Sequence, residues 1–413
     1  MEKLGIYIHI PFCKQKCKYC DFISFKCSEK EQELYIESLI KEIKNYDYYK
    51  KIKEIENIYQ QNEKKVLKLF EIEDSKWNEN YSKVLNRKIT SIYIGGGTPS
   101  FIDSKNIKKI LDEIRKKFFI DENCEITIEV NPGTITKEKL NDYKDAGINR
   151  ISIGLQSTNN RLLKLIGRIH TYEDFCEAYK LAKEANFNNI NVDLMLALPT
   201  QTIQELEESI DKIIKLNPNH ISIYSLIIEE RTELKKMVDN KELELIDEEK
   251  ERKMYWNIKK KLENNGYNHY EISNYAKKGF ESKHNIDCWN QEEYIGFGLG
   301  AHSYINKMRF SNIINFYDYI ENIKNEKFEK NLELHEVQDR ESQAKEYMLL
   351  GFRKIDGISI SKFEKKFRIN PLFYFRFEIS KLTEEGLIEV DLDNIKLTKK
   401  GIDLANLVFQ EFI

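Results

Sequence analysis

Three cysteines lie close together near the N-terminus, at Cys13, Cys17 and Cys20. A single loop of this length brings three sulfur atoms to one centre, and thiolates are the ligands that zinc and iron–sulfur clusters take in proteins. Structural zinc sites close a set of four ligands, commonly from two cysteine pairs, and no second pair follows here. Three thiolates leave one metal position open. The spacing therefore favours an iron–sulfur centre, with structural zinc or a chance group of buried cysteines as the alternatives.

Glycine and polar residues follow several short apolar runs downstream of the cysteines. They are Gly95-Gly96-Gly97-Thr98-Pro99, Glu129-Val130-Asn131-Pro132, Gly154-Leu155-Gln156-Ser157, and Asp193 ahead of Ala197-Leu198-Pro199. Glycine lets a backbone approach a ligand closely, and the carboxyl ends of parallel barrel strands share one face. Each group alone is equally well explained by a structural hydrogen bond. Together with the cysteine loop, the four groups predict one site at that face.

The elements that must position these residues alternate between strand and helix over residues 5–230. The expected strands are Gly5–Ile10, Ser91–Gly95, Glu125–Val130, Arg150–Gly154, Asn191–Leu196 and His220–Leu226, and the clearest helices are Asn106–Phe118, Tyr172–Ala185 and Ile203–Leu216. Such alternation indicates a parallel sheet with crossover helices. Six units predict an α/β fold, a partial (β/α)6 parallel barrel. A doubly wound open sheet is the alternative.

The chain is too long for one ordinary core, so we expect several units. Residues 1–230 are predicted to form the barrel, with a charged insertion at about 45–88 on its outside. Residues 231–336 are predicted to extend the barrel, starting with a helix at Glu248–Asn264. Residues 337–413 read as helices followed by two strands around Asp391–Asn394, which indicates a winged-helix-like α+β unit. Its segment Phe373–Lys381 carries mixed charges, so packing or partner contact is expected rather than DNA binding.

Composition excludes several classes of protein. There are 66 basic and 69 acidic residues, and this near-balance argues against a general nucleic-acid binder. No apolar stretch approaches the roughly 18 residues that a transmembrane helix requires. The first ten residues lack the basic flank and long apolar run of a signal peptide. We therefore expect a cytoplasmic protein, and in a reducing compartment clustered cysteines indicate metal binding rather than disulfides.

The cysteine spacing C-x3-C-x2-C after the first strand of a parallel barrel resembles the signature of radical S-adenosylmethionine (SAM) proteins. The chain outside the insertion is similar to their coproporphyrinogen-oxidase-like branch, from Tyr7-Ile8-His9-Ile10-Pro11-Phe12-Cys13 onward. The resemblance implies a [4Fe–4S] cluster on the three cysteines, bound SAM and an electron donor for the cluster. It implies a SAM site lined by Tyr7, Tyr19, Gly96, Gly97, Thr98, Glu129, Gln156, Arg168 and Asp193. Glu129 would accept from the SAM amino group, Asp193 would bind ribose or another SAM group, and Arg168 would complement the carboxylate unless it is an ordinary surface arginine.

Within this branch, the chain resembles heme chaperones of the HemW type. The oxygen-independent coproporphyrinogen III dehydrogenases carry a further cysteine where this chain has Phe22, and an N-terminal extension ahead of the first strand. The chaperones lack both and carry a His-Asn-x-x-Tyr-Trp motif, which matches His284 to Trp289 except that Cys288 replaces tyrosine. The resemblance implies heme binding and heme transfer to client hemoproteins, and it names no catalytic residue. The alternatives are the dehydrogenase and a radical SAM enzyme acting on another substrate.

The histidines are the first candidates for a heme-iron ligand. His284 lies in the motif, in a segment expected to be irregular, and an adjacent aromatic can pack on a porphyrin. A histidine that only braces this loop is an equal alternative, and Cys288 is another possible ligand. His9 is expected to point into the barrel near SAM, and His220 to be structural. His170 and His335 are expected in polar helical surroundings, exposed to solvent.

Overall fold

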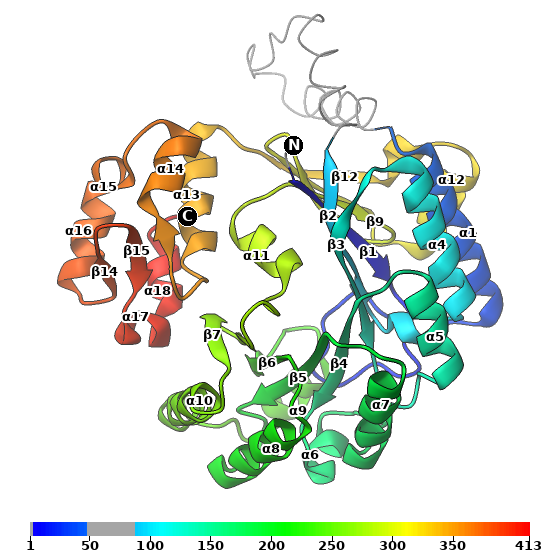
Figure 1. The fold of residues 1–413 in the computed structure, drawn as a ribbon, viewed down its shortest axis with the longest axis horizontal. Coiled ribbons are helices and arrows are strands. Elements are labelled where there is room, and N and C mark those ends of the chain that lie inside the picture. Colours follow the sequence, from blue (N-terminus) through cyan, green and yellow to red (C-terminus); the bar gives the residue numbers. More distant parts are fainter. Residues whose placement is uncertain (1–2, 48–86) are drawn as a thin grey trace, which may run out of the picture.

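One large curved sheet organises the computed structural model, which describes residues 3–47 and 87–413 (Figure 1). In spatial order, its strands are β12 (Leu332–Val337), β11 (Met308–Asn312), β10 (His302–Ile305), β9 (Tyr294–Phe297), β1 (Lys3–Ile10), β2 (Lys88–Gly96), β3 (Ile120–Val130), β4 (Arg150–Gln156), β5 (Ile190–Leu196), β6 (His220–Ser225), β8 (Asn274–Ala276) and β7 (Asn268–Glu271). The insertion expected at about 45–88 lies outside the described residues except at its two ends.

The six strands β1–β6 are neighbours in chain order and pair in parallel throughout. This sequential order confirms the predicted partial barrel, because a doubly wound sheet reverses its strand order at a switch point. All six predicted strands are present. Strand β9 joins the free side of β1, again in parallel, and β10–β12 continue from it antiparallel. Strands β8 and β7 extend the other side beyond β6.

Helices cover the outer, convex face of the parallel strands (Figure 1). Among the described residues, the helices before β7 are α1 (Glu29–Asn45), η1 (Pro99–Phe101), α4 (Ser104–Lys117), α5 (Lys137–Asp145), α6 (Asn160–Leu165), α7 (Tyr172–Glu184), α8 (Ile203–Leu216), α9 (Glu233–Asp239) and α10 (Glu248–Glu263). Capping boxes begin three of them, at Ser28, Thr171 and Thr202. In each, two backbone N–H groups that the first helical turn leaves unpaired are satisfied by side chains.

The two faces of each strand differ in character, and this difference positions the site. On β1, Ile6, Ile8 and Ile10 are fully buried among the apolar core residues. Successive strand residues point to opposite faces, so Tyr7 and His9 lie on the inner, concave face. The outer face therefore holds the apolar core under the helices. The inner face is free to carry polar side chains.

The segment between β8 and β9 departs from the sequence expectation. Lys283–Trp289 forms helix α11, begun by Ser282, whose hydroxyl accepts from the Asn285 N–H; we had expected irregular structure. Figure 1 shows α11 on the concave side of the sheet. His335 was expected in helical surroundings, but it lies in strand β12 after α12 (Phe316–Lys324) and η2 (Phe328–Asn331).

The C-terminal residues pack around a separate hydrophobic core. Their elements are α13 (Arg340–Gly351), β13 (Ile358–Ser359), α14 (Ile360–Phe367), α15 (Pro371–Tyr374), α16 (Arg376–Glu384), β14 (Ile388–Val390), β15 (Asn394–Leu397), α17 (Lys399–Asp403) and α18 (Ala405–Gln410). The helices and the β14–β15 hairpin match the winged-helix-like prediction. The structure adds β13, which completes a small antiparallel sheet, and the two final helices.

Candidate functional site: two adjoining cavities inside the sheet

The cysteine loop leaves the end of β1 and is fixed at both its base and its tip. At the base, the Cys13 N–H donates to the Phe25 carbonyl at 3.0 Å, and the Phe25 N–H donates to the Pro11 carbonyl at 2.9 Å. At the tip, the Lys18 N–H donates to the Ile166 carbonyl at 3.0 Å, and the Lys18 carbonyl accepts from the Leu234 N–H at 2.9 Å. These backbone bonds hold the loop across the carboxyl ends of the parallel strands.

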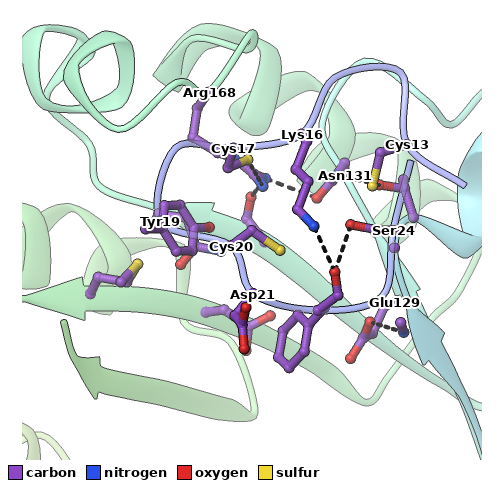
Figure 2. Close-up of a pocket in the computed structure, with 18 of the residues that line it drawn as sticks. Cys13, Lys16, Cys17, Tyr19, Cys20, Asp21, Ser24, Glu129, Asn131 and Arg168 are labelled. Atoms are coloured by element: carbon purple, nitrogen blue, oxygen red, sulfur yellow. Dashed lines mark hydrogen bonds between the residues drawn. The ribbon is translucent and has the colours of Figure 1, made fainter. Parts of the chain in front are cut away.

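All three cysteines of the loop are free thiols and line one cavity (Figure 2). The Cys13 sulfur lies 3.5 Å from the Thr98 hydroxyl, and an Arg168 guanidinium nitrogen lies 3.6 Å from the Cys17 sulfur. Burial raises the pKa of the Cys13 and Cys20 thiols, and the neighbouring thiol groups add to this effect. Metal binding must therefore displace protons from these sulfurs, as it does at thiolate sites in general.

The first cavity has a volume of about 450 Å³ and collects most of the residues that the sequence singled out. Besides the three cysteines, it is lined by Tyr19, Gly96, Gly97, Thr98, Glu129, Gln156, Arg168 and Asp193. Sequence reasoning missed Tyr93, Ser152 and Tyr224 in the same wall. Tyr93 and Ser152 stand two residues before Gly95 and Gly154, so strict alternation along the predicted strands would have found them.

Glu129 is held at the end of β3 by two donors. The Tyr93 hydroxyl donates to one carboxylate oxygen at 2.8 Å, and the Gly96 N–H donates to the other at 3.1 Å. Burial, with the nearby Asp193 carboxyl, raises the pKa of Glu129 to about 7. Gly96 has a φ of +114°, and a Cβ there would stand 2.6 Å from the His9 ring. Only glycine therefore brings this N–H group to the carboxylate without strain.

Asp193 is the second carboxyl group of the first cavity. It accepts from the Ser152 hydroxyl at 2.9 Å and from the Asn191 amide at 2.7 Å, and burial raises its pKa. Neither Asp193 nor Glu129 makes an ion pair with any of the residues in the described ranges. Two buried carboxyl groups without a paired cation suit a positively charged ligand.

Arg168 is not the ordinary surface arginine that was the alternative. Its guanidinium donates to the Asn131 side-chain oxygen at 2.8 Å and to the Gly154 carbonyl at 2.5 Å, beside Cys17. Its Nε is buried without a partner among the described residues. One donor of this arginine is therefore still unused next to the cysteine loop.

A second cavity of about 420 Å³ adjoins the first on the inner face of the sheet. It is lined by Tyr7, His9, Asp21, Phe22, Ile23, His284, Cys288, Tyr294, Gly300 and His302. Asp21 and Phe22 line both cavities. Tyr7, expected at the SAM site, lines this second cavity, and its ring stacks on Tyr93, which lines the first.

His284 enters the second cavity from α11. Its Nδ1 lies 3.0 Å from the Ser91 hydroxyl, and its ring stacks on Tyr93 with the ring centroids 5.2 Å apart. Burial, and the positive charge of Arg150, lower the pKa of His284 to about 4, so the imidazole is neutral. Cys288, one helical turn along α11, has its pKa raised to about 12 by burial and remains a thiol. The Ser91 bond gives His284 a bracing role, and its second ring nitrogen has no hydrogen-bond partner among the described residues.

The other histidines differ in how their ring nitrogens are used. His9 also lines the second cavity, and both of its ring nitrogens are engaged, with the Tyr7 hydroxyl and the Ile23 carbonyl. His220 is fully buried between Asn191 and Tyr270, as its structural interpretation required. His170 was expected in solvent; instead it is 6% exposed, because its ring packs under the Leu155 carbonyl.

Comparisons with known proteins agree over the whole chain. Residues 78–213 match the radical SAM superfamily, and residues 338–404 match the HemN C-terminal domain. The heme chaperone HemW of Lactococcus lactis is 36% identical over 407 residues, which cover 98% of this chain and 96% of the relative. The heme chaperone HemW of Bacillus subtilis is 35% identical over 408 residues, 98% of each chain.

The fold also has a counterpart among solved structures. Coproporphyrinogen III oxidase (HemN) from Escherichia coli, a radical SAM enzyme, superposes with a TM-score of 0.77 and 19% identity, covering 100% of this chain and 90% of that one. No helix among the described residues is long and apolar enough to cross a membrane. The radical SAM family implies SAM and a [4Fe–4S] cluster. The cysteine loop, the fold and the full-length similarity together show that this chain belongs to the HemW family of radical SAM proteins.

Proposed function

We propose that the protein is a heme chaperone: it binds heme in the second cavity and transfers it to client hemoproteins, while the first cavity holds a SAM-binding [4Fe–4S] cluster. The observation that carries the proposal is the second cavity itself, where the neutral imidazole of His284 stands beside the cysteine loop. Neutral imidazole ligates heme iron, and Phe22 and Tyr294 offer aromatic surface for a porphyrin. The relatives that match the full length are named heme chaperones.

The donor set of the first cavity fits the cluster and SAM. Cys13, Cys17 and Cys20 would hold three irons of the cluster and leave the fourth open to SAM. Glu129 would accept from the SAM ammonium, and the Asp193 carboxylate would bind a hydroxyl or attract the sulfonium. Arg168, which lines the cavity, would complement the charge of the SAM carboxylate. When bound, the reduced cluster supplies the electron that cleaves SAM. The residues named here fix the orientation of SAM and exclude water.

Porphyrinogen oxidation remains the main alternative, and Phe22 argues against it. The dehydrogenases carry a cysteine at this position, where the ring of Phe22 is 70% exposed between the two cavities. The likeness to the E. coli oxidase lies under 20% identity and shows the fold alone. We therefore propose no catalytic residue.

We propose three units: residues 1–230 as the barrel, 231–336 as its extension and 337–413 as the C-terminal unit. We propose that the protein is cytoplasmic and that a separate donor supplies electrons to the cluster.

Heme transfer is the direct test. The cluster-reconstituted protein is titrated with ferric heme, and the loaded protein is mixed with excess apomyoglobin as a generic acceptor. We expect one heme per chain and its appearance in the acceptor. His284→Ala should weaken heme binding while iron–sulfur content stays intact; Cys288→Ser is the matched variant one helical turn away. Failure of the wild-type protein to bind stoichiometric heme would refute the proposed function. Loss of binding in Cys288→Ser alone would move the ligand to that residue.

A further inference from the structure

A third histidine of the second cavity, His302, has features that suit an iron ligand. We propose that the His302 imidazole is a second heme-iron ligand, placed at the open side of the second cavity and supported from behind by His335. This inference rests on the proposed function and deepens it, because it identifies the ligand from which heme is handed over.

The first support is the way the sheet extension holds the His302 ring. His302 on β10 is paired with Ser311 on β11, and His335 lies on the next strand, β12. Strands two apart are separated by nearly 10 Å, so side chains on them meet only across a small residue. Ser311 is small, and the two imidazoles stack over it with centroids 5.2 Å apart and planes inclined by 21°. The Ser311 hydroxyl lies 2.8 Å from His335 Nε2 and fixes the outer ring.

The second support is the state of the ring nitrogens. His9 uses both of its nitrogens, and His284 uses one, in a side chain that is only 9% exposed. His302 is exposed at the surface, and within residues 3–47 and 87–413 neither of its nitrogens has a hydrogen-bond partner. Burial of one ring face, with the nearby His335 and Arg309, lowers the pKa of His302. The ring is therefore neutral near pH 7, with a lone pair available to a metal.

The third support is the shape and chemistry around His302. Gly300, two residues before it, has a φ of +64°, and a Cβ there would stand 2.2 Å from the Ile23 Cδ1 atom. Glycine at this position therefore leaves room for the Ile23 side chain, which lines this side of the cavity. Phe22 and Ile314, 70% and 60% exposed, lie at this side, and Ile314 packs against Gly300. Apolar side chains left exposed around an opening suit a flat hydrophobic ligand.

A cation near His302 suits the carboxylates that heme carries. Arg309 lies directly opposite Tyr304 on the neighbouring strand, and its guanidinium lies 4.4 Å from the centre of the Tyr304 ring. Its Nε donates to Glu346 at 2.6 Å, which holds the group in place. Arg309 acts electrostatically on Cys288, Tyr294 and His302, three residues of the cavity wall. Arg309 is ion-paired with Glu346 and does not line the cavity, so it would act on a heme carboxylate only through its electrostatic field.

Transfer from this position is a ligand exchange. The bond between iron and a His302 nitrogen breaks as an acceptor side chain binds the iron, and the imidazole leaves as a neutral group. The oxidation state of the iron does not change. Because His302 is exposed whereas His284 is buried on α11, an acceptor reaches the His302 side of the iron first.

The spin state of bound ferric heme tests the assignment. In cluster-reconstituted protein, two imidazole ligands should give a six-coordinate low-spin spectrum by absorption and electron paramagnetic resonance. His302→Ala should convert it to a high-spin spectrum with iron–sulfur content unchanged, and added imidazole should restore the low-spin form. Release to apomyoglobin should become faster, by about tenfold for the loss of one ligand. His302→Gln provides a second variant with a polar side chain of similar reach.

His335→Ala is the matched control, since His335 stacks on His302 but does not line the cavity. It should keep the low-spin spectrum with a smaller change in release rate. A low-spin spectrum and an unchanged release rate in both His302→Ala and His302→Gln would overturn the proposal, while heme binding by the wild-type protein would leave the proposed function standing. Absence of heme binding in the wild-type protein would refute the proposed function itself.

Discussion

Two buried carboxyl groups, for which residues 3–47 and 87–413 provide no ion-pair partner, give the first cavity its chemical character. Glu129 and Asp193 are held by hydroxyl, amide and backbone donors, and burial raises the pKa of both. Fixing such groups in a buried position is costly unless a ligand compensates their charge. The ammonium and sulfonium of SAM carry charge of the required sign. The three thiols that line the same cavity are the proposed ligands of the cluster.

Removal of any one thiol of the loop should abolish the cluster. Cys13→Ala, Cys17→Ala and Cys20→Ala should each lose the charge-transfer absorption and most of the roughly four irons of an anaerobically reconstituted [4Fe–4S] protein, since each sulfur is a ligand. Cys27→Ala and Cys176→Ala should keep them. Cys27 is the sharper control, because it lies close enough to Cys13 for electrostatic interaction. Full iron content in Cys17→Ala would contradict the assignment.

Binding of SAM should depend on pH through Glu129. Its pKa of about 7 means that the carboxylate needed by an ammonium group is protonated in acid. The affinity for SAM, measured by equilibrium dialysis on the cluster-containing protein, should be highest above pH 7 and fall by up to about tenfold per pH unit below it.

Glu129→Gln is the control for this pH dependence. The amide cannot titrate, so the variant should bind SAM more weakly with a flatter pH profile between pH 6 and 8. An unchanged slope in Glu129→Gln would assign the dependence to another group, of which Asp193, also with a raised pKa, is the nearest.

The end of strand β2 shows how one element places two parts of the site. Gly96 donates to Glu129 and leaves the space that the His9 ring occupies. Gly96→Ala should lower the midpoint of thermal unfolding, because the new Cβ overlaps the ring and the φ of +114° is strained for alanine. Gly133→Ala is the matched control: its φ is +77°, with nothing within 4 Å of the added Cβ.

The two variants separate overlap from backbone strain. Gly133→Ala should show only the cost of the positive φ, about 1 kcal/mol, and Gly96→Ala about 1–3 kcal/mol more. Equal shifts in the melting temperature would mean that the His9 ring moves aside freely.

The elements that sequence patterns located are those with strong local signals. The strands β1–β6 carry repeated Ile, Val and Leu residues and alternate with helical segments, so their order followed from the chain alone, as did residues at their ends such as Glu129. The extension of the sheet, strands β9–β12, was harder to predict from the sequence. Strands β9–β12 are four to six residues long. Strand β9 joins the sheet by pairing with β1, far away in sequence, and β10–β12 pair onward from it. The place of His335 in β12 depends on that pairing: its helical surroundings were predicted wrongly, and its exposure to solvent was predicted correctly.

Helix α11 illustrates the same limit. Its seven residues include Asn285 and Asp287, which disfavour helix interiors, so no local pattern predicts it. Packing decides instead, since the Ser91 hydroxyl and the Tyr93 ring fix His284 from the sheet side. The heme-ligand candidate was therefore identified by motif alone. The three-dimensional structure was needed to show that the His284 imidazole is neutral and that only one of its ring nitrogens is hydrogen-bonded within the described residues.

At the scale of the whole molecule, the two cavities share Asp21 and Phe22. A reaction between SAM in the first cavity and a porphyrin in the second would therefore take place past these two residues. We expect no conversion of coproporphyrinogen III to protoporphyrinogen IX under reducing, anaerobic conditions with SAM present, because Phe22 stands where the dehydrogenases have a thiol. Product formation is followed by porphyrin fluorescence after oxidation, with the E. coli oxidase as the positive control. Sustained turnover would favour the dehydrogenase over the chaperone.

The central place of β1 in the sheet has a consequence for synthesis on the ribosome. Strand β1 is made first and pairs with β2 on one side, but its other neighbour, β9, begins only at Tyr294. At translation rates of about 5–20 residues per second, the barrel strands β1–β6 and the cysteine loop emerge well before β9 and α11. The walls of the first cavity can therefore assemble on the nascent chain before β9 and α11, which line the second cavity, have been made. The three cysteines proposed as cluster ligands are therefore available to bind metal before the residues proposed to bind heme are in place.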